Sequence, residues 1–460
     1  MRLSDLRGRS VAVWGTGREG RAAVTAIAAH GPASLVAVDD SANFLSLPWS
    51  GPLAQAAPLH TGPEAFGRLA AADVVVRSPG VPQTHPWLVE LRGRGVTVTS
   101  GTALWMADHA ARTVGVTGSK GKSTTSSLIS HLLTAVGRPN VFGGNIGVPL
   151  LDLPDAELYV LELSSYQCSD LTDSPRVAVV TALFPEHLDA HGGEQEYYRD
   201  KLNLLGHGPE TVVLNGTDAR LLAQVDERFG DKLGDRPAVR AGGPENFHVA
   251  PGPDSRPYLH AGSEPLFPRA ALPLVGRHNE SNLCVALAVL DALGVDTVAR
   301  RETLAEAVAG FQGLPHRLAE IADPTGLTFV DDTLATSPYS TMHAIDAYEG
   351  RPLTVIVGGT DRGLDYGPLR EHLSTRAITV IGIPDSGPRI VDQLRDLPEV
   401  RTELAEDLVE AVRLARELTP AGGVVLLSPA APSYGRFRNW EHRSEVFVEA
   451  IESTRALAGR

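Results

Sequence analysis

The feature that most constrains this chain is a glycine-rich segment near residue 120, which joins a strand-like run to a helix-like run. The segment reads Gly115-Val-Thr-Gly118-Ser-Lys-Gly121-Lys122-Ser123-Thr124. The run 112–117 is typical of a buried strand, and the apolar spacing over 123–136 predicts a helix. Such a strand, turn and helix N-terminus present backbone N–H groups to phosphate oxygens. We therefore predict a phosphate-binding loop, with a purely structural loop as the alternative.

The spacing within this segment supports the same interpretation. Lys122 and Ser123 stand where the common G-x-x-x-x-G-K-[ST] pattern has its lysine and hydroxyl, although Val116 replaces the first glycine. The lysine would counter phosphate charge, and the hydroxyl would hold Mg²⁺. The residues expected to contact ATP here are Gly118, Ser119, Lys120, Gly121, Lys122, Ser123 and Thr124.

Strand-like and helix-like runs alternate along most of the 460 residues, which predicts three α/β domains, the first of them doubly wound. We assign 1–108, 109–312 and 313–460 to the three domains, with a Gly/Pro hinge at 311–315. The stretch 241–268 is rich in Gly and Pro and lacks helical spacing, so we expect a β-rich insertion or loop there.

Composition restricts the partners of the chain. Its net charge of −14 argues against broad binding to nucleic acid or anionic membranes. No apolar run approaches the roughly 18 residues of a transmembrane helix, and the N-terminus lacks a signal-peptide pattern, so we expect a cytoplasmic protein without membrane insertion. Two cysteines, Cys168 and Cys284, are too few for a disulfide scaffold or a cysteine zinc site.

A second glycine-rich turn lies near the N-terminus, in Val11-Ala-Val-Trp14-Gly15-Thr-Gly17-Arg-Glu-Gly20. It is followed by Asp39-Asp40 near the spacing of a ribose contact. Taken alone, this pattern suggests NAD and an oxidoreductase. That alternative leaves the phosphate loop unexplained.

Motifs spread over nearly the whole chain make it resemble the Mur ligase superfamily of ATP-dependent, amide-forming ligases. In chain order they are Gly144-Asn145-Ile-Gly147, Leu161-Glu162-Leu-Ser-Ser165-Tyr-Gln167, Glu186-His187-Leu-Asp189, Tyr198-Arg-Asp-Lys201, Arg277-His278-Asn279-Glu-Ser-Asn282 and Pro315-His316-Arg317. The resemblance implies an α/β fold of three domains, with a Rossmann-like N-terminal domain, a central P-loop ATPase domain and a Rossmann-like C-terminal domain. It also implies activation of a carboxylate as an acyl phosphate.

The resemblance also implies a catalytic and metal-binding group. Lys122 would bind phosphate, while Ser123, Glu162, His187 and Lys201 would hold Mg²⁺ ions. Lys201 matches a lysine that carries a carbamate in this family, which turns an ammonium into an anionic ligand. From the residues alone, Glu162 could be a buried structural carboxylate, and Lys201 could be a solvated lysine on an amphipathic helix.

Further binding residues follow from the same resemblance. Asn279, Arg317 and Asp332 would complete the ATP site. Gly15, Gly17, Arg18 and Ser78 would contact the UDP end of the acceptor, and Asn145 its muramoyl portion. The alternatives are helix capping for Asn279 and tight packing for Gly17.

The third domain departs from the pattern of the ligases that add D-glutamate. Their Asp-Ser-Lys-Ala-Thr-Asn is replaced by Asp332-Thr-Leu-Ala-Thr336-Ser, and Arg362 follows Gly358-Gly359 where they carry a lysine. Arginine binds a carboxylate through a planar fork and must place it differently from a lysine. These changes resemble the branch that adds L-glutamate to UDP-N-acetylmuramoyl-L-alanine, with a separate epimerase acting on the product. We expect Thr336, Arg362, Ser433 and Trp440 to form the glutamate pocket. D-glutamate addition, a folylpolyglutamate synthase-like ligase and a catalytically inactive ATP-binding protein are the alternatives.

Overall fold

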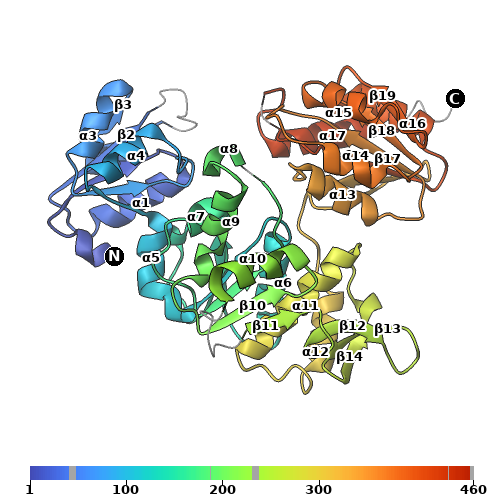
Figure 1. Ribbon diagram of the computed structural model, residues 1–460, viewed down its shortest axis with the longest axis horizontal. Helices are drawn as coiled ribbons and strands as arrows, with labels where there is room; N and C mark the ends of the chain where they lie inside the picture. Colours follow the sequence, from blue (N-terminus) through green and yellow to red (C-terminus); the bar gives the residue numbers. More distant parts are fainter. Residues whose placement is uncertain (41–47, 187, 231–237, 434, 456–460) are drawn as a thin grey trace. The chain divides into compact units, whose positions relative to one another are not determined.

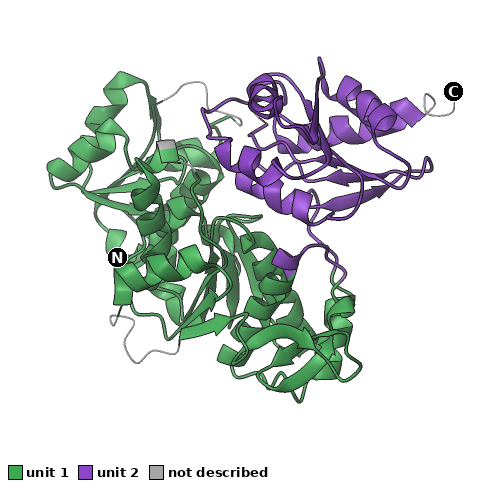
Figure 2. Cartoon of the chain, turned by 45° about the vertical axis from the view of Figure 1, so that its right-hand side comes forward, with its two compact units in different colours: residues 1–272, 280–311 green, residues 273–279, 312–460 purple. Residues whose placement is uncertain are grey.

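The computed structural model describes residues 1–40, 48–186, 188–230, 238–433 and 435–455. The chain forms two compact units (Figure 2). Unit 1 comprises Met1–Leu272 and Glu280–Phe311, and unit 2 comprises Pro273–Asn279 and Gln312–Arg460. The ranges given above for three domains stay a prediction, while the α/β class and its parallel sheets are confirmed.

The first sheet of unit 1 is parallel, with the strand order β3-β2-β1-β4-β5 (Figure 1). Its strands are β1 Ser10–Trp14, β2 Ser34–Asp39, β3 Leu59–Thr61, β4 Val74–Arg77 and β5 Thr97–Ser100. Its helices are α1 Arg18–Ala28, α2 Pro52–Ala56, α3 Phe66–Ala70, α4 Pro86–Gly93 and α5 Gly101–His109. Alternate residues of β1 pack on opposite faces, Val13 in one apolar cluster with residues of α1 and Ala12 in another with residues of α4.

The second sheet of unit 1 is also parallel, in the order β11-β10-β9-β6-β8-β7. Its strands are β6 Thr113–Thr117, β7 Val141–Gly144, β8 Tyr159–Glu162, β9 Val177–Val180, β10 Thr211–Asn215 and β11 Ala238–Ala241. The associated helices are α6 Lys122–Ala135, α7 Ser165–Cys168, α8 Leu188–His191, α9 Glu194–Leu202, α10 Ala219–Phe229, α11 Arg277–Ala292 and α12 Arg301–Ala309. Because β6 lies between β8 and β9, the carboxyl ends of these three strands share one edge of the sheet.

The Gly/Pro-rich stretch folds as a small antiparallel sheet, which confirms the predicted β-rich insertion. Its strands are β12 Phe247–Pro251, β13 Pro257–Ala261 and β14 Glu264–Pro268. Leu259 and Phe267 face each other across β13 and β14 and are buried, so the sheet has a small apolar face.

Unit 2 contains a six-stranded sheet in the order β15-β16-β20-β17-β18-β19, parallel except for the edge strand β15. Its strands are β15 Ala319–Ala322, β16 Thr328–Asp331, β17 Leu353–Val357, β18 Ile378–Gly382, β19 Val400–Leu404 and β20 Val424–Leu427. Its helices are α13 Pro338–Asp346, α14 Gly367–Leu373, α15 Ser386–Leu394, α16 Leu408–Leu418 and α17 Trp440–Thr454. Apolar clusters cover both faces, which explains why every residue of β17 and β20 is buried.

A buried ion pair ties the edge of this sheet to two helices. Arg416 on α16 donates to both carboxylate oxygens of Asp323, at 3.1 and 2.9 Å, and Arg455 contacts the same carboxylate at 3.3 Å. Burial alone would raise the pKa of Asp323, but hydrogen bonds from Arg416 and Thr325 outweigh it and hold the pKa below its ordinary value. The carboxylate therefore stays ionised in the folded protein.

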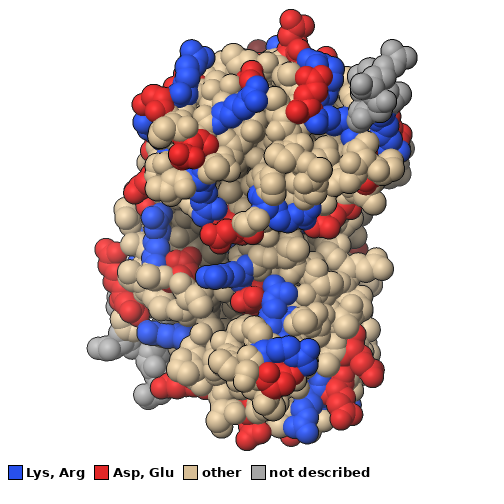
Figure 3. Space-filling model, turned by 90° about the vertical axis from the view of Figure 1, so that its right-hand side faces the viewer, with Lys and Arg blue, Asp and Glu red and all other residues tan. Residues whose placement is uncertain are grey.

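The surface carries mixed charge. Acidic and basic side chains alternate over the face drawn in Figure 3 and gather there into no large basic patch. In the described part of the chain, no helix is long and apolar enough to cross a membrane.

Candidate active site

The first candidate binding region lies at the carboxyl ends of β1 and β4, the point where the strand order of the first sheet reverses. Ligands of open α/β sheets bind at such a point. The backbone of Ser78 donates to Trp14 O at 2.8 Å, and its hydroxyl donates to Gly15 O at 3.3 Å. Gly15 has φ +103°, and a Cβ there would lie 2.7 Å from Ser78 Cβ. The two predicted loops are therefore in direct contact.

Two glycines of the N-terminal turn have different structural roles. A Cβ at Gly20 would lie 1.8 Å from Gly15 O, so Gly20 is required for packing. A Cβ at Gly17 would meet nothing within 4 Å, so the tight-packing alternative for Gly17 is wrong. Arg18 is exposed and donates to Gly147 O at 3.1 Å. Asp39 accepts hydrogen bonds from the backbone and hydroxyl of Thr16, and so supports the turn.

The predicted phosphate loop joins β6 to α6 as expected. Gly118 and Gly121 have φ of +147° and +86°, and a Cβ at Gly121 would lie 2.6 Å from Asn282 Oδ1. The ammonium of Lys122 donates to Gly118 O at 2.9 Å and to Ser119 O at 3.2 Å. Ser119 is buried, and its hydroxyl donates to Phe184 O, so its side chain supports the loop.

The rest of the loop lies at the start of α6. Ser123 is buried in the first helical turn, whereas Lys120 and Thr124 are half-buried. The loop therefore combines two left-handed glycines, a lysine and a helix N-terminus, which is the arrangement that binds phosphate.

Glu162 is the last residue of β8 and is 1% exposed. Its Oε1 accepts a hydrogen bond from Asn145 Nδ2 at 2.8 Å. Among the described residues, its Oε2 has no hydrogen-bond partner. A buried carboxylate oxygen without a donor is unfavourable unless a cation binds it. The structural alternative, a fully paired buried carboxylate, therefore fits the geometry less well than a cation ligand does.

Lys201 lies on α9 and is only 2% exposed, so the alternative of a solvated lysine is wrong. Its ammonium donates to Gly118 O at 2.8 Å, the carbonyl that also accepts from Lys122. Burial, together with the positive charge of Lys122, lowers the pKa of Lys201 to about 7. The buried Lys201 and the half-buried Lys122 thus converge on one carbonyl.

The predicted metal ligands fit Mg²⁺ chemistry in part. Oxygen donors are what Mg²⁺ prefers, and the unpaired Glu162 Oε2 and the hydroxyl of Ser123 supply them. His187 lies outside the described residues. Within the residues that the structure describes, no three His, Cys, Asp or Glu side chains form a metal-binding group.

A chain of buried hydrogen bonds near this site was not predicted from the sequence. Ser165 Oγ lies 3.0 Å from His191 Nε2, and His191 Nδ1 lies 2.8 Å from Asp200 Oδ2. The three residues lie on α7, α8 and α9 and are all buried. Ser165 stands three residues after Glu162, and Asp200 directly precedes Lys201, which is the signal that the sequence offers. No local pattern shows that these two residues and His191 contact one another.

In unit 2, the remaining candidates follow three neighbouring strands. Asp332 and Thr336 follow β16, Arg362 follows β17, and Ser433 follows β20. Asp332 accepts a hydrogen bond from Ser428 Oγ at 3.0 Å. The carboxyl ends of adjacent parallel strands share one edge, so these residues occupy the crevice side of the sheet.

Arg362 is exposed and forms no ion pair with any described residue. Its neighbour Asp361 pairs instead with Arg389, at 2.5 Å. The alternative in which Arg362 serves only as a surface ion pair therefore has no support in the geometry.

The fourth glutamate candidate lies at the start of α17. The Trp440 ring packs edge-on against His316 at 5.1 Å, and His316 Nδ1 lies 2.7 Å from Asp331 Oδ2. Arg317 follows His316 directly and is half-buried. Asn279 belongs to unit 2 and donates to Val275 O at 2.7 Å, a local contact at the start of α11.

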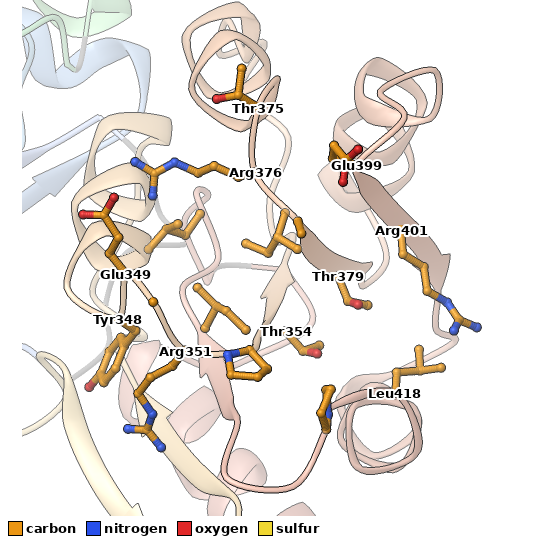
Figure 4. Close-up of a pocket in the computed structure, with 17 residues that line it drawn as sticks. Tyr348, Glu349, Arg351, Thr354, Thr375, Arg376, Thr379, Glu399, Arg401 and Leu418 are labelled. Carbon is orange, nitrogen blue, oxygen red and sulfur yellow. The ribbon is translucent and has the colours of Figure 1, made fainter.

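A cavity of about 220 Å³ lies at the same edge of unit 2 and includes Ser433. Gly359, Asp385, Arg436 and Phe437 also line it, and Asp385 lies 3.5 Å from Arg436. A larger hollow of about 780 Å³ lies at the opposite edge, where β17 and β18 begin (Figure 4). It contains none of the predicted residues.

Comparisons with known proteins agree with this geometry. Residues 116–290 match the family model described as the Mur ligase middle domain. A UDP-N-acetylmuramoyl-L-alanine--L-glutamate ligase of a Micromonospora species is 81% identical over 454 residues, covering 99% of each chain.

Solved structures with lower identity show the same fold. The UDP-N-acetylmuramate-alanine ligase of Thermotoga maritima superimposes with a TM-score of 0.58 at 20% identity, covering 97% of this chain and all of the other. The MurF ligase of Thermotoga maritima, in complex with ADP, gives 0.58 at 18% identity, covering 98% and 97%.

Proposed function

This chain belongs to the Mur ligase family, and we propose that it joins L-glutamate to UDP-N-acetylmuramoyl-L-alanine with ATP, in peptidoglycan precursor synthesis. One observation carries the chemistry. The ammonium groups of Lys122 and Lys201 meet at Gly118 O, at the edge of the sheet where β8 ends in the buried carboxylate of Glu162. Such a site favours an anion between the lysines and a cation at the carboxylate.

In the first proposed step, a carboxylate oxygen of the acceptor's terminal alanine attacks the γ-phosphorus of ATP. The bond between that phosphorus and the β–γ bridging oxygen breaks, ADP leaves, and an acyl phosphate forms. Lys122 would rotate from Gly118 O to the phosphate oxygens and counter the charge of the transferring group. Because the loop already holds this lysine close to Gly118, the movement needed is small.

In the second step, the amine of glutamate attacks the acyl carbon. A C–N bond forms, the bond from carbon to the phosphate oxygen breaks, and inorganic phosphate leaves while the nitrogen loses a proton. The crevice of unit 2 supplies groups suited to glutamate, because Arg362 can grip a carboxylate bidentately and the hydroxyls of Thr336 and Ser433 can donate hydrogen bonds. Trp440 would limit the shape of this pocket.

Mg²⁺, when bound, would neutralise phosphate charge, and Ser123, Glu162, His187 and Lys201 are the residues proposed to hold it. Lys201 could serve only as a carbamate, because an ammonium repels a cation. Its burial beside Lys122 supports that modification, since a carbamate would place a negative charge next to the Lys122 ammonium instead of a second positive one. Asn145 keeps the Glu162 carboxylate oriented through the contact to Oε1.

The acceptor would enter across the first sheet. Gly15, Gly17, Arg18 and Ser78 would contact its UDP end at the carboxyl ends of β1 and β4, and the open space at Gly17 supports this assignment. ATP would complete its contacts through Asn279, Arg317 and Asp332. We place the reaction in the cytoplasm, and an epimerase acting on the L-glutamate product would follow it.

A matched assay tests this proposal. The full-length protein is given UDP-N-acetylmuramoyl-L-alanine, ATP and Mg²⁺ with either L-glutamate or D-glutamate, and phosphate release and the new amide are measured together. We expect both signals with L-glutamate. Amide formation with D-glutamate alone would overturn the stereochemistry, and phosphate release without any amide would overturn the ligase reaction.

A further inference from the structure

A buried ion pair joins the two parallel sheets of unit 1 beside the candidate acceptor site. Arg77 is the last residue of β4 and directly precedes Ser78, whereas Asp170 lies two residues beyond the end of α7. The Arg77 side chain is 0% exposed and that of Asp170 is 6% exposed. A charged pair with so little solvent contact is held in one geometry by its surroundings.

The guanidinium of Arg77 is satisfied on all sides. Its Nε and Nη2 donate to Asp170 Oδ2 at 3.0 and 2.5 Å, and Nη2 also lies 3.2 Å from Ser169 Oγ. Its Nη1 donates to Val81 O, the end of the loop that begins at Ser78. Each of these bonds is directional, so the arginine fixes the loop and the segment after α7 relative to each other.

A second side chain reinforces the same connection. Gln83 Nε2 donates to Ser169 Oγ at 2.7 Å and to Asp170 Oδ1 at 2.9 Å. Oδ1 of Asp170 thus accepts a hydrogen bond from Gln83, which lies just after the loop 78–81 of the first sheet. Both oxygens of the carboxylate therefore accept hydrogen bonds, and Arg92 Nη2 lies 3.7 Å from Oδ1, so the buried charge is compensated.

The two segments joined in this way are the ones that must be aligned for the chemistry. The loop 78–81 borders the crevice of the first sheet, and Asp170 is connected through α7 to the strand that ends in Glu162. Gln167 of α7 makes a parallel link to the first sheet, donating to Glu19 at 3.2 Å. The N-terminal turn and the loop 78–81 are therefore both tied to α7.

We infer that Arg77 and Asp170 are positioning residues, which hold the acceptor-binding loop in register with the segment that follows Glu162. The pair would align the acceptor's carboxylate with the transferring phosphate without touching either one. This inference depends on the proposed function, because it takes the loop 78–81 as part of the acceptor site.

Asp170→Asn tests the inference with little change of shape. We expect kcat/KM for the UDP-linked acceptor to fall about 10- to 100-fold, because misalignment by a fraction of an ångström is costly in such reactions. The KM for ATP should stay within about twofold. Arg77→Lys keeps the charge but loses the fork, so it should reproduce the same selective defect.

The double variant Arg77→Lys with Asp170→Asn should be no worse than the more impaired of the two single variants, because either change already breaks the same contact. The matched control is Glu210→Gln, which removes the exposed ion pair to Arg176 in the same unit. The control should leave both kinetic constants unchanged.

Melting temperature and active-site concentration are measured for every variant. A lowered melting temperature with an unchanged kcat/KM for the acceptor would mean that the pair serves stability alone and would overturn the inference. An increase in the KM for ATP as large as the loss of kcat/KM for the acceptor would overturn it too. Failure of the proposed function is distinguishable, since the unmodified protein would then form no amide with this acceptor.

Discussion

The hydrogen bond from Asn145 to Glu162 allows a quantitative prediction for Asn145→Asp. The substitution puts an oxygen where Asn145 Nδ2 now stands, 2.8 Å from Glu162 Oε1. A donor becomes an acceptor with a negative charge, while the size of the side chain is almost unchanged. The carboxylate of Glu162 would therefore face a like charge at hydrogen-bond distance.

The magnitude follows from that distance. Two like charges 2.8 Å apart repel by about 6 kcal/mol at an effective dielectric constant of ~20, and by about 1.5 kcal/mol in water. Glu162 is buried but Asn145 is exposed, so the site lies between these limits. An intermediate value of about 3 kcal/mol corresponds to a loss of roughly 100-fold in kcat/KM.

The assay compares Asn145→Asp with Asn145→Ala, which removes the donor without adding charge. We expect kcat/KM for the acceptor at saturating ATP to be about 100-fold lower in the Asp variant than in the Ala variant. If the Asp variant equals or exceeds the Ala variant at every Mg²⁺ concentration, the oxygen of Glu162 is not the electrostatically sensitive group that the geometry indicates.

Four further predictions follow from the same structure. Lys122→Ala should abolish amide formation while leaving the melting temperature near that of the unmodified protein, and an active variant would contradict its role. Activity lost in Lys201→Ala should return in part with added short carboxylates such as formate, measured as amide formation; no recovery at any concentration would argue against an anionic group there. Gly17→Ala should weaken acceptor binding in calorimetry with little change of stability, whereas Gly20→Ala should lower the melting temperature because its Cβ would overlap Gly15 O. Asp323→Asn should lower the free energy of unfolding of unit 2 by about 3–5 kcal/mol in denaturant titrations. Because the folded-state pKa of Asp323 is depressed, the stability that its carboxylate contributes is present above about pH 4 and is lost as the pH falls. The unfolding free energies of the variant and the unmodified protein should therefore converge in acid.

Local signals in the sequence were sufficient for the phosphate loop and its flanking elements. A strand, left-handed glycines and a helix start are determined within a few residues, and β6 and α6 lie where the pattern predicted them. Edge strands carry a weaker signal, because β15 and β19 have few fully buried residues, whereas every residue of β17 and β20 is buried. They form because a neighbouring strand presents an open edge.

The parts of the site that depend on tertiary packing could not be predicted in the same way. Lys201 stands on a helix with many charged residues, and its burial results from the packing of α9 against the phosphate loop. Arg77 and Asp170 are separated by 93 residues. The family resemblance indicated a role for Lys201 but did not predict its burial or its contact with Gly118. It did not indicate any role for Arg77.

The division of the chain into units has a consequence for protein engineering. The chain passes between the units three times, after Leu272, after Asn279 and after Phe311. The short segment 273–279 contributes Val275 to the apolar cluster of unit 2 and places the His278 ring 6.0 Å from that of His343. A chimaera that takes only residues 312–460 from a related ligase would pack the sheet of that ligase against residues 273–279 of this chain. Exchange of amino-acid specificity between relatives should therefore transfer both pieces together.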